Sequence, residues 1–197
     1  RQIFSKIDER LESFPDSEPG LVNLLSVFAT TGESLFIGNS LPIREWNEFG
    51  QRETPYARVF ANRGANGIDG QLSSWLGATA ETPDSWGVFG DLTTLYDLAA
   101  PAMFSQVECQ GRVIVVINNG GGQIFEHLPR FSQLTKNQKD VIIQPQEFDL
   151  KGWALMWDMD YLRIENREGF DALEVGEKAL LVELIPNYSE TAQFYAV

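Results

Sequence analysis

The chain has 197 residues, a length that fits one domain with a hydrophobic core of ordinary size. Its content of 43% hydrophobic and 12% aromatic residues favours a globular domain over a disordered chain. With 15 basic against 28 acidic residues the net charge is −13, which argues against nucleic acid or an anionic membrane as a partner. A small anion held by local arginines and backbone donors remains compatible with that charge.

No apolar run is long enough to cross a bilayer, and no secretory signal pattern opens the chain, so we expect a cytoplasmic protein. A single cysteine, Cys109, and a single histidine, His127, provide neither an internal disulfide nor a His/Cys metal cluster. His127 is expected to face solvent and to have no catalytic role.

Residues 1–30 are predicted to be a linker and a first helix from a preceding domain, and residues 31–197 to form one further domain. Ser17 has the character of a helix N-cap, because Glu18 and Pro19 follow it in the first turn. The next residues place Leu21, Leu25 and their neighbours on one apolar helix face.

From residue 34 onward, short apolar runs alternate with amphipathic stretches. Residues 131–144 are polar and are predicted to be an irregular surface segment, and residues 169–174 a helical turn. The alternation indicates an α/β fold: a doubly wound, mostly parallel sheet with helices on both faces. The predicted strands are residues 34–37, 58–61, 86–89, 113–117, 161–165 and 180–185, and the predicted helices are residues 42–49, 72–79, 95–105 and 147–157.

Four of the predicted strands end in unusual loops: residues 38–40, 62–70, 90–92 and 118–123. If the sheet is parallel, these four loops lie along one of its edges. Open α/β sheets bind ligands at the carboxyl ends of their strands. The clustering of the loops therefore predicts a binding site at that edge.

Asp91 and the pair Asn118 and Asn119 follow two strands that a predicted helix joins. Such a crossover makes the two strands parallel neighbours, so a carboxylate and an amide emerge at the same edge of the sheet. Together with a backbone carbonyl from residues 120–122, they match the oxygen ligands that Mg²⁺ prefers. Because Asp91 also precedes a helix start, whose free N–H groups favour an anion, a diphosphate bridged by Mg²⁺ is the predicted ligand.

This pattern resembles the diphosphate-binding domain of thiamin-diphosphate enzymes, whose signature is Gly-Asp-Gly followed at about this interval by Asn-Asn. Here Leu92 replaces the third glycine. The sequence of residues 90–98, GDLTTLYDL, is similar within that superfamily to the 2-succinyl-5-enolpyruvyl-6-hydroxy-3-cyclohexene-1-carboxylate synthase family of menaquinone biosynthesis. Residues 35–44, residues 62–70, and residues 118–125 followed by Leu128 and Pro129 resemble the same family, so the likeness covers most of residues 35–130.

The resemblance implies a transferase that uses thiamin diphosphate and Mg²⁺ (or Mn²⁺) to decarboxylate 2-oxoglutarate and add the succinyl unit to isochorismate. In that family the glutamate that activates the cofactor belongs to a pyrimidine-binding domain of the same or a partner subunit, which implies a homo-oligomer. No stretch of residues 1–197 resembles that domain. We therefore expect no catalytic residue in this chain, and no synthase activity from the chain alone.

The resemblance also implies a set of cofactor contacts. Asp91, Asn119 and the carbonyl of Gly121 would bind the metal; Asn119 is chosen over Asn118 because the family places the metal amide on the second asparagine. Ile68 would be the apolar wedge that holds the cofactor in its V shape, although such a residue also suits a core anchor. The remaining implied cofactor contacts are Ser40 at the aminopyrimidine ring, Gly64 and Gly67 in the second loop, and Gly90, Leu92 and Thr93 around the diphosphate.

Two arginines are the implied clamps for substrate carboxylates. Arg44 and Arg63 each follow a loop of the predicted edge, and arginine can direct two N–H groups at one carboxylate. The alternative for both is a solvated surface position or an ion pair. Ile124, Phe125 and Leu128 would form an apolar wall for the substrate, with packing in the core as the alternative.

Two other functions remain open from the sequence. One is a different thiamin-diphosphate carboligase or decarboxylase, such as an acetolactate-synthase-like enzyme, which has less need of the two arginines. The other is a non-catalytic diphosphate-binding module, against which the pairing of Asp91 with Asn119 weighs.

Overall fold

The computed structural model describes residues 2–64, 66–82, 84–126, 128 and 130–196, with the side chains of residues 2–5 excepted. Within these residues the chain forms a six-stranded sheet in the order β2-β1-β3-β4-β6-β5. Every neighbouring pair of strands is parallel, which confirms the predicted α/β class. The strands are β1 (Ser34–Ile37), β2 (Val59–Phe60), β3 (Ser85–Gly90), β4 (Val113–Ile117), β5 (Asp160–Ile164) and β6 (Leu180–Leu184).

The described α-helices differ widely in length. They are α1 (Gln2–Ser13), α2 (Glu18–Phe28), α3 (Leu41–Phe49), α4 (Gln71–Ala78), α5 (Asp91–Leu95), α6 (Lys136–Ile143), α7 (Lys151–Met156) and α8 (Tyr188–Tyr195). Short 3₁₀ helices are η1 (Ala29–Thr31), η2 (Ala100–Ser105), η3 (Gln123–Phe125), η4 (Phe131–Gln133) and η5 (Arg167–Ala172). No described helix is both long and apolar enough to span a membrane.

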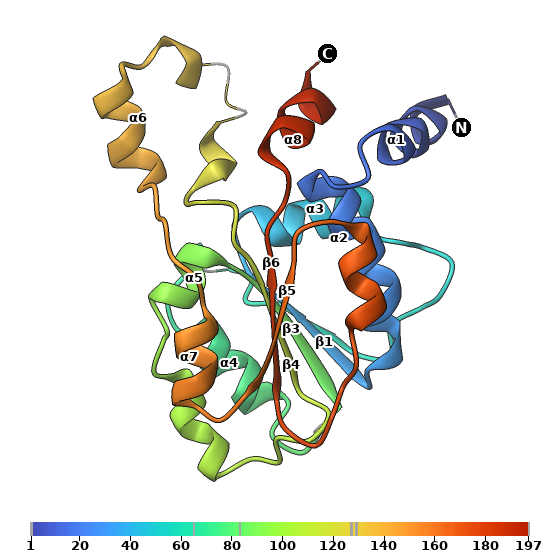
Figure 1. The fold of residues 1–197 in the computed structure, drawn as a ribbon, viewed down its shortest axis with the longest axis vertical. Helices are drawn as coiled ribbons and strands as arrows, with labels where there is room; N and C mark the ends of the chain where they lie inside the picture. The colour runs from blue at the N-terminus through green and yellow to red at the C-terminus, as the bar shows by residue number, and fades with distance from the viewer. Residues whose placement is uncertain (1, 65, 83, 127, 129, 197) are drawn as a thin grey trace.

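Helices cover both faces of the sheet, as Figure 1 shows. On one face α2, α3 and η5 pack on the strands through residues such as Leu21, Leu25 and Phe170. On the other face α4, η2 and α7 pack through Trp75 and Trp153 among others. Continuous apolar strands such as Val113–Ile117, buried at every position, are what a sheet covered on both sides requires.

Three sequence predictions of local structure are wrong in detail. Residues 131–144 are not irregular but contain η4 and α6, which begins with a capping box between Thr135 and Gln138. The single helix predicted for residues 95–105 is replaced by α5 and η2, because Pro101 has no N–H for a continuous α-helix. The helix predicted for residues 147–157 begins only at Lys151. Helix α8 was not predicted.

The strand order places the site. The chain passes from β1 to β2 on one side and then to β3 on the other, so the connections diverge between β1 and β3. In open α/β sheets, ligands bind outside the carboxyl ends of the strands at such a switch point. In Figure 1, α1, α6 and α8 stand beyond this end of the sheet, where both chain termini also lie.

Candidate diphosphate and cation site

A cavity of about 370 Å³ opens at the carboxyl ends of β1, β3 and β4. All four loops that follow β1, β2, β3 and β4 contribute to its lining, so the sheet brings together segments far apart in the sequence. We call this space the edge cavity. The predicted site residues that line it are Ser40, Arg44, Arg63, Ile68, Gly90, Asp91, Leu92, Thr93, Asn119, Gly121, Ile124 and Phe125.

Three predicted residues do not line the edge cavity. Leu128 lines an adjacent hollow together with Arg44 and Phe125. Gly64 and Gly67 belong to the loop that forms one wall: Gly64 has a φ of 102°, and the Gly67 carbonyl accepts hydrogen bonds from neighbouring side chains. His127 and Pro129 lie outside the described residues, so the expectation that His127 faces solvent is untested.

Asp91 joins the loop after β3 to the loop after β4. Gly90 pairs with Ile117 in the register of the two strands, so both loops begin side by side. The Asp91 carboxylate accepts a hydrogen bond from the backbone N–H of Gly121 at 2.6 Å through Oδ2, and another from that of Leu92 at 2.6 Å through Oδ1. Each oxygen retains a lone pair that a cation or a donor can use.

The Asp91 carboxyl is only 2% exposed, and burial raises its pKa to about 6. The backbone N–H groups of Leu92 and Gly121 lower the pKa in part, because they stabilise the charged form. An opposite charge nearby would stabilise that form further. Among the described residues, no cationic side chain forms an ion pair with this buried carboxylate.

The two asparagines after β4 have different surroundings. Asn118 Nδ2 donates to Oε1 of Glu183 at 2.7 Å and to the Phe148 carbonyl at 3.0 Å. Asn119 lines the edge cavity, and its Nδ2 donates to both carboxylate oxygens of Glu18. Its Oδ1 is buried and accepts no hydrogen bond from the described residues.

A buried amide oxygen without a hydrogen-bond partner is uncommon in folded proteins, and it indicates a position where a ligand or a cation binds. The amide oxygen of Asn119, the Asp91 carboxylate and the Gly121 carbonyl are oxygen donors of the kind that Mg²⁺ binds. The described residues contain no group of three or more His, Cys, Asp or Glu side chains that could hold a metal by themselves. These three donors therefore fit a hard cation shared with a ligand, such as one bridging a diphosphate.

Gly121 needs to be a glycine at this point. Its φ is 128°, and a Cβ there would lie 2.6 Å from the Ile143 carbonyl oxygen. Its own carbonyl already accepts from the backbone N–H of Gln123 at 2.8 Å and keeps a second lone pair. The N–H of Gly122 donates to the Ile143 carbonyl at 2.6 Å, so the loop is held from both sides.

A buried carboxyl pair lies behind Asn119. Glu18 on α2 and Glu45 on α3 are 2% and 1% exposed and hydrogen-bond to each other, and Tyr195 on α8 donates to Glu45 Oε1 at 3.1 Å. Burial raises the pKa of Glu18 to about 7. It also raises the pKa of Glu45 well above the ordinary value, helped by the charge of Glu18. The pair therefore shares a proton, with Glu45 as its donor.

Sequence reasoning missed this pair. Glu18 reads as an ordinary acid in the first turn of a helix, because Ser17 caps α2 through the N–H of Gly20. Its contact with Asn119 spans 101 residues, so no local pattern announces it.

The two arginines lie at the mouth of the edge cavity with their charges uncompensated. Arg44 Nη1 donates to the Ser40 carbonyl at 2.5 Å, and Arg63 Nη1 donates to Asn39 Oδ1 at 3.1 Å. Both side chains belong to exposed residues, and neither forms an ion pair with any described acid. The ion-pair alternative thus has no support in the described part of the chain. Both guanidinium groups can therefore bind an anionic group of a ligand.

Ser40 has a backbone conformation that is rare for any residue but glycine, with a φ of 74° and a ψ of −131°. Such a conformation costs on the order of 1–3 kcal/mol and is found mainly where function holds it in place. It lets the chain turn from β1 into α3 while keeping Ser40 and Arg44 at the cavity.

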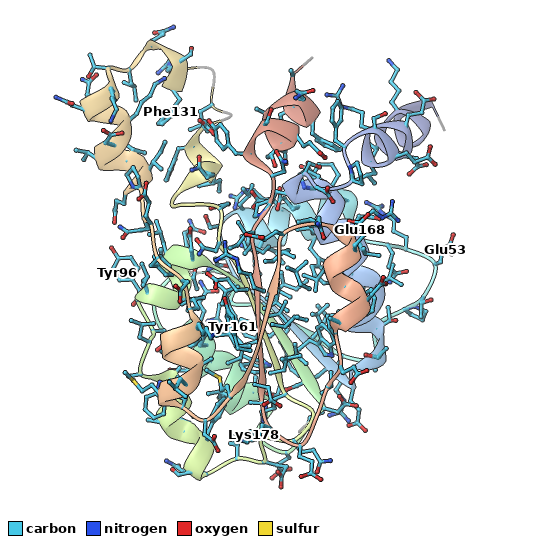
Figure 2. All side chains as sticks on the ribbon, viewed as in Figure 1. Glu53, Tyr96, Phe131, Tyr161, Glu168 and Lys178 are labelled. Carbon is cyan, nitrogen blue, oxygen red and sulfur yellow. The ribbon has the colours of Figure 1, made fainter. Side chains whose placement is uncertain are left out.

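A segment that contains η4 and α6 stands beyond the carboxyl end of the sheet (Figure 1). Figure 2 shows Phe131 in this outlying segment, at the opposite end of the molecule from Lys178. The segment is anchored beside the site, because the Gln146 N–H donates to the Gly120 carbonyl at 3.2 Å and Tyr96 donates to Gln144 at 3.4 Å.

Comparison with known proteins finds no matching family model. Curated relatives do match. A 2-succinyl-5-enolpyruvyl-6-hydroxy-3-cyclohexene-1-carboxylate synthase from Akkermansia muciniphila is 43% identical over 189 residues, which is 95% of this chain and 36% of that protein. Proteins of the same name from Bdellovibrio bacteriovorus and a Roseiflexus species are 38% and 33% identical over 97% and 86% of this chain, and 35% and 29% of their own lengths. The chain thus spans about a third of the length of these relatives.

Proposed function

Because the chain belongs to the 2-succinyl-5-enolpyruvyl-6-hydroxy-3-cyclohexene-1-carboxylate synthase family, we propose that it is the C-terminal cofactor-binding domain of such a synthase. In this proposal the edge cavity holds the diphosphate of thiamin diphosphate through Mg²⁺ or Mn²⁺. The proposal rests on the buried Oδ1 of Asn119, which accepts from no described donor and belongs to a residue lining the same cavity as Asp91.

The proposed roles follow from the position of each residue. Asp91, Asn119 and the Gly121 carbonyl bind the cation, and the backbone N–H groups and Thr93 hydroxyl at the start of α5 lie where diphosphate oxygens can be bound. Ser40 contacts the aminopyrimidine ring. Gly64 and Gly67 belong to the loop that carries Ile68, which would be the apolar wedge that holds the cofactor.

When bound, thiamin diphosphate supplies the electron sink for decarboxylation of a 2-oxo acid, while the protein binds, orients and excludes water. The substrates proposed are 2-oxoglutarate and isochorismate, both carboxylates. Arg44 and Arg63 line the cavity, form no ion pair with a described acid, and would bind these carboxylates by paired N–H groups. Ile124, Phe125 and Leu128 would form the apolar wall beside them.

Among the described residues that line the edge cavity, the acids are Asp91, assigned to the cation, and Glu18, whose carboxylate is engaged by Asn119 and Glu45. We therefore propose that the activating glutamate comes from a pyrimidine-binding domain of the same or a partner subunit. The synthase would then be a homo-oligomer of the cytoplasm. Domain boundaries are part of the same proposal: residues 1–30 would link to the preceding domain, and residues 31–197 would form the cofactor-binding domain. The 197-residue chain by itself should have no synthase activity, and measurable turnover by the purified chain would refute this.

Another thiamin-diphosphate carboligase, of the acetolactate-synthase kind, is the alternative reaction. A comparison of 2-oxoglutarate with pyruvate as donor, with isochorismate as acceptor and the full-length protein as enzyme, separates the two. The proposal expects product from 2-oxoglutarate and little or none from pyruvate. A preference for pyruvate would point to the alternative. A non-catalytic module would give no product from either donor.

A further inference from the structure

We propose that Glu18 is a positioning residue that fixes the amide of Asn119 with its oxygen toward the cation. This inference rests on the proposed function and assigns a role to α2, a helix outside the signature of residues 90–121. Glu18 lines the edge cavity but is not proposed as a ligand of the cation. It acts through Asn119.

The contact itself carries the orientation. Asn119 Nδ2 lies 2.9 Å from Glu18 Oε1 and 3.1 Å from Glu18 Oε2. Both oxygens of a carboxylate only accept hydrogen bonds, so only the N–H₂ end of the amide can face them. The other end of the amide, Oδ1, must then face away from α2, and it is the buried atom without a described partner.

Without this constraint the amide has two orientations of nearly equal shape. Rotation by 180° would turn N–H₂ toward the cation, where it cannot act as a ligand. A fixed partner for the group opposite the metal is how proteins set the orientation of metal ligands, and its loss commonly lowers metal affinity by about 10- to 100-fold.

The surroundings hold Glu18 in place. Its backbone N–H donates to Thr191 Oγ1 of α8 at 2.9 Å, and its carboxylate hydrogen-bonds to Glu45 of α3. These contacts fix Glu18 between α2, α3 and α8.

Glu18→Gln is the primary test, measured in the full-length protein. In the observed side-chain position, glutamine would set one amide N–H₂ against Asn119 Nδ2, since both carboxylate oxygens lie within 3.1 Å of that atom. Glu18→Asp keeps the acid but withdraws it by one methylene, and serves as a second variant if the first does not fold. Glu45→Gln is the matched control: its amide can still donate to Glu18 and accept from Tyr195.

Mn²⁺ affinity in the presence of thiamin diphosphate is measured by electron paramagnetic resonance, together with the melting temperature of each unliganded protein. We expect Glu18→Gln and Glu18→Asp to weaken Mn²⁺ binding by about 10- to 100-fold. The Mn²⁺ affinity of Glu45→Gln should stay within about threefold of that of the unmodified protein, because this substitution leaves the hydrogen bonds between Glu18 and Asn119 in place.

Equal Mn²⁺ affinity of Glu18→Gln and the unmodified protein would overturn the inference while leaving the proposed function intact. So would an equal loss in Glu45→Gln, because that would assign the effect to the buried pair as a whole and not to the orientation of Asn119. If the unmodified protein itself binds no Mn²⁺ with thiamin diphosphate, the proposed function fails and this inference with it.

Discussion

Asp91 Oδ2 accepts a hydrogen bond from the backbone N–H of Gly121 at 2.6 Å, across 30 residues of sequence. This bond ties the loop after β3 to the loop after β4 at the place where the two strands end side by side. It brings a buried carboxylate, a glycine carbonyl and the amide of Asn119 to the same cavity.

Asp91→Asn should abolish or greatly weaken Mg²⁺-dependent binding of thiamin diphosphate in the full-length protein. The substitution removes the only anionic ligand proposed for the cation, so a loss of at least about 100-fold is expected, above the range for residues behind the ligands. Calorimetric titration measures it, and circular dichroism shows whether the fold persists. Asp171→Asn, at an exposed position in η5, should bind as the unmodified protein does. Unchanged affinity in Asp91→Asn would remove Asp91 from the site.

Gly121→Ala should destabilise the 197-residue chain by about 1–3 kcal/mol, because alanine is strained at a φ of 128° and its Cβ would meet the Ile143 carbonyl. Gly152→Ala in α7 is the matched control: no atom lies within 4 Å of its added Cβ, and alanine favours helix by up to about 1 kcal/mol. Urea unfolding measures both. Equal effects of the two substitutions would contradict a special role for the conformation of Gly121.

Arg63→Lys should lower kcat/KM for the substrates of the full-length protein by about 10- to 100-fold, because lysine keeps the charge but not the paired N–H geometry. Affinity for thiamin diphosphate should not change, since Arg63 is not assigned to the cofactor. Steady-state kinetics with 2-oxoglutarate and isochorismate varied in turn would show which carboxylate it binds. Arg167→Lys, exposed in η5, is the control. Unchanged kinetics in Arg63→Lys would contradict the substrate-binding role and favour the alternative, a solvated surface position.

The carboxyl pair predicts how stability depends on pH in the absence of a cation. Burial raises the pKa of Glu18 to about 7. Burial also raises the pKa of Glu45 well above its ordinary value, and the charges of Glu18 and Glu48 act in the same direction. The folded chain therefore holds protons that the unfolded chain releases near its ordinary pKa of about 4.5. Their contribution to stability is complete below pH 4.5 and is lost as the pH rises through about 7. Asp91, with its pKa raised to about 6, acts in the same sense.

The unfolding free energy of the cation-free chain should thus fall between about pH 4.5 and 7.5, with a slope of at most about 1.4 kcal/mol per pH unit for each proton. Glu45→Gln removes one of these groups and should make the slope shallower. Urea unfolding at several pH values measures it. A stability that rises over this interval, or an identical slope in Glu45→Gln, would contradict the shared proton.

The sheet and its edge could be predicted because they depend on local patterns. Fully apolar runs such as Val113–Ile117 indicate strands buried on both faces, and helical crossovers force them to be parallel. The parallel arrangement alone therefore predicts that Asp91 and Asn119 emerge at the same edge of the sheet. The helix at Lys136–Ile143 could also have been predicted, since Thr135 and Gln138 have the spacing of a capping box.

Other features depend on contacts that no local pattern records. Glu18 looks like any first-turn acid until α2 packs on α3 and sets it against Asn119. The positive φ of Ser40 could likewise not be predicted, because the loop of residues 38–40 indicates where β1 ends but not the backbone conformation of its serine. Both depend on how the helices pack over the switch point, which tertiary structure decides.

The most direct measurement is an equilibrium titration of thiamin diphosphate into the full-length protein with and without Mg²⁺, with ATP, a triphosphate, as the comparison ligand. We expect saturable binding of thiamin diphosphate only when Mg²⁺ is present, and no comparable binding of ATP. Binding that does not depend on Mg²⁺, or that favours ATP, would contradict the assignment of the edge cavity.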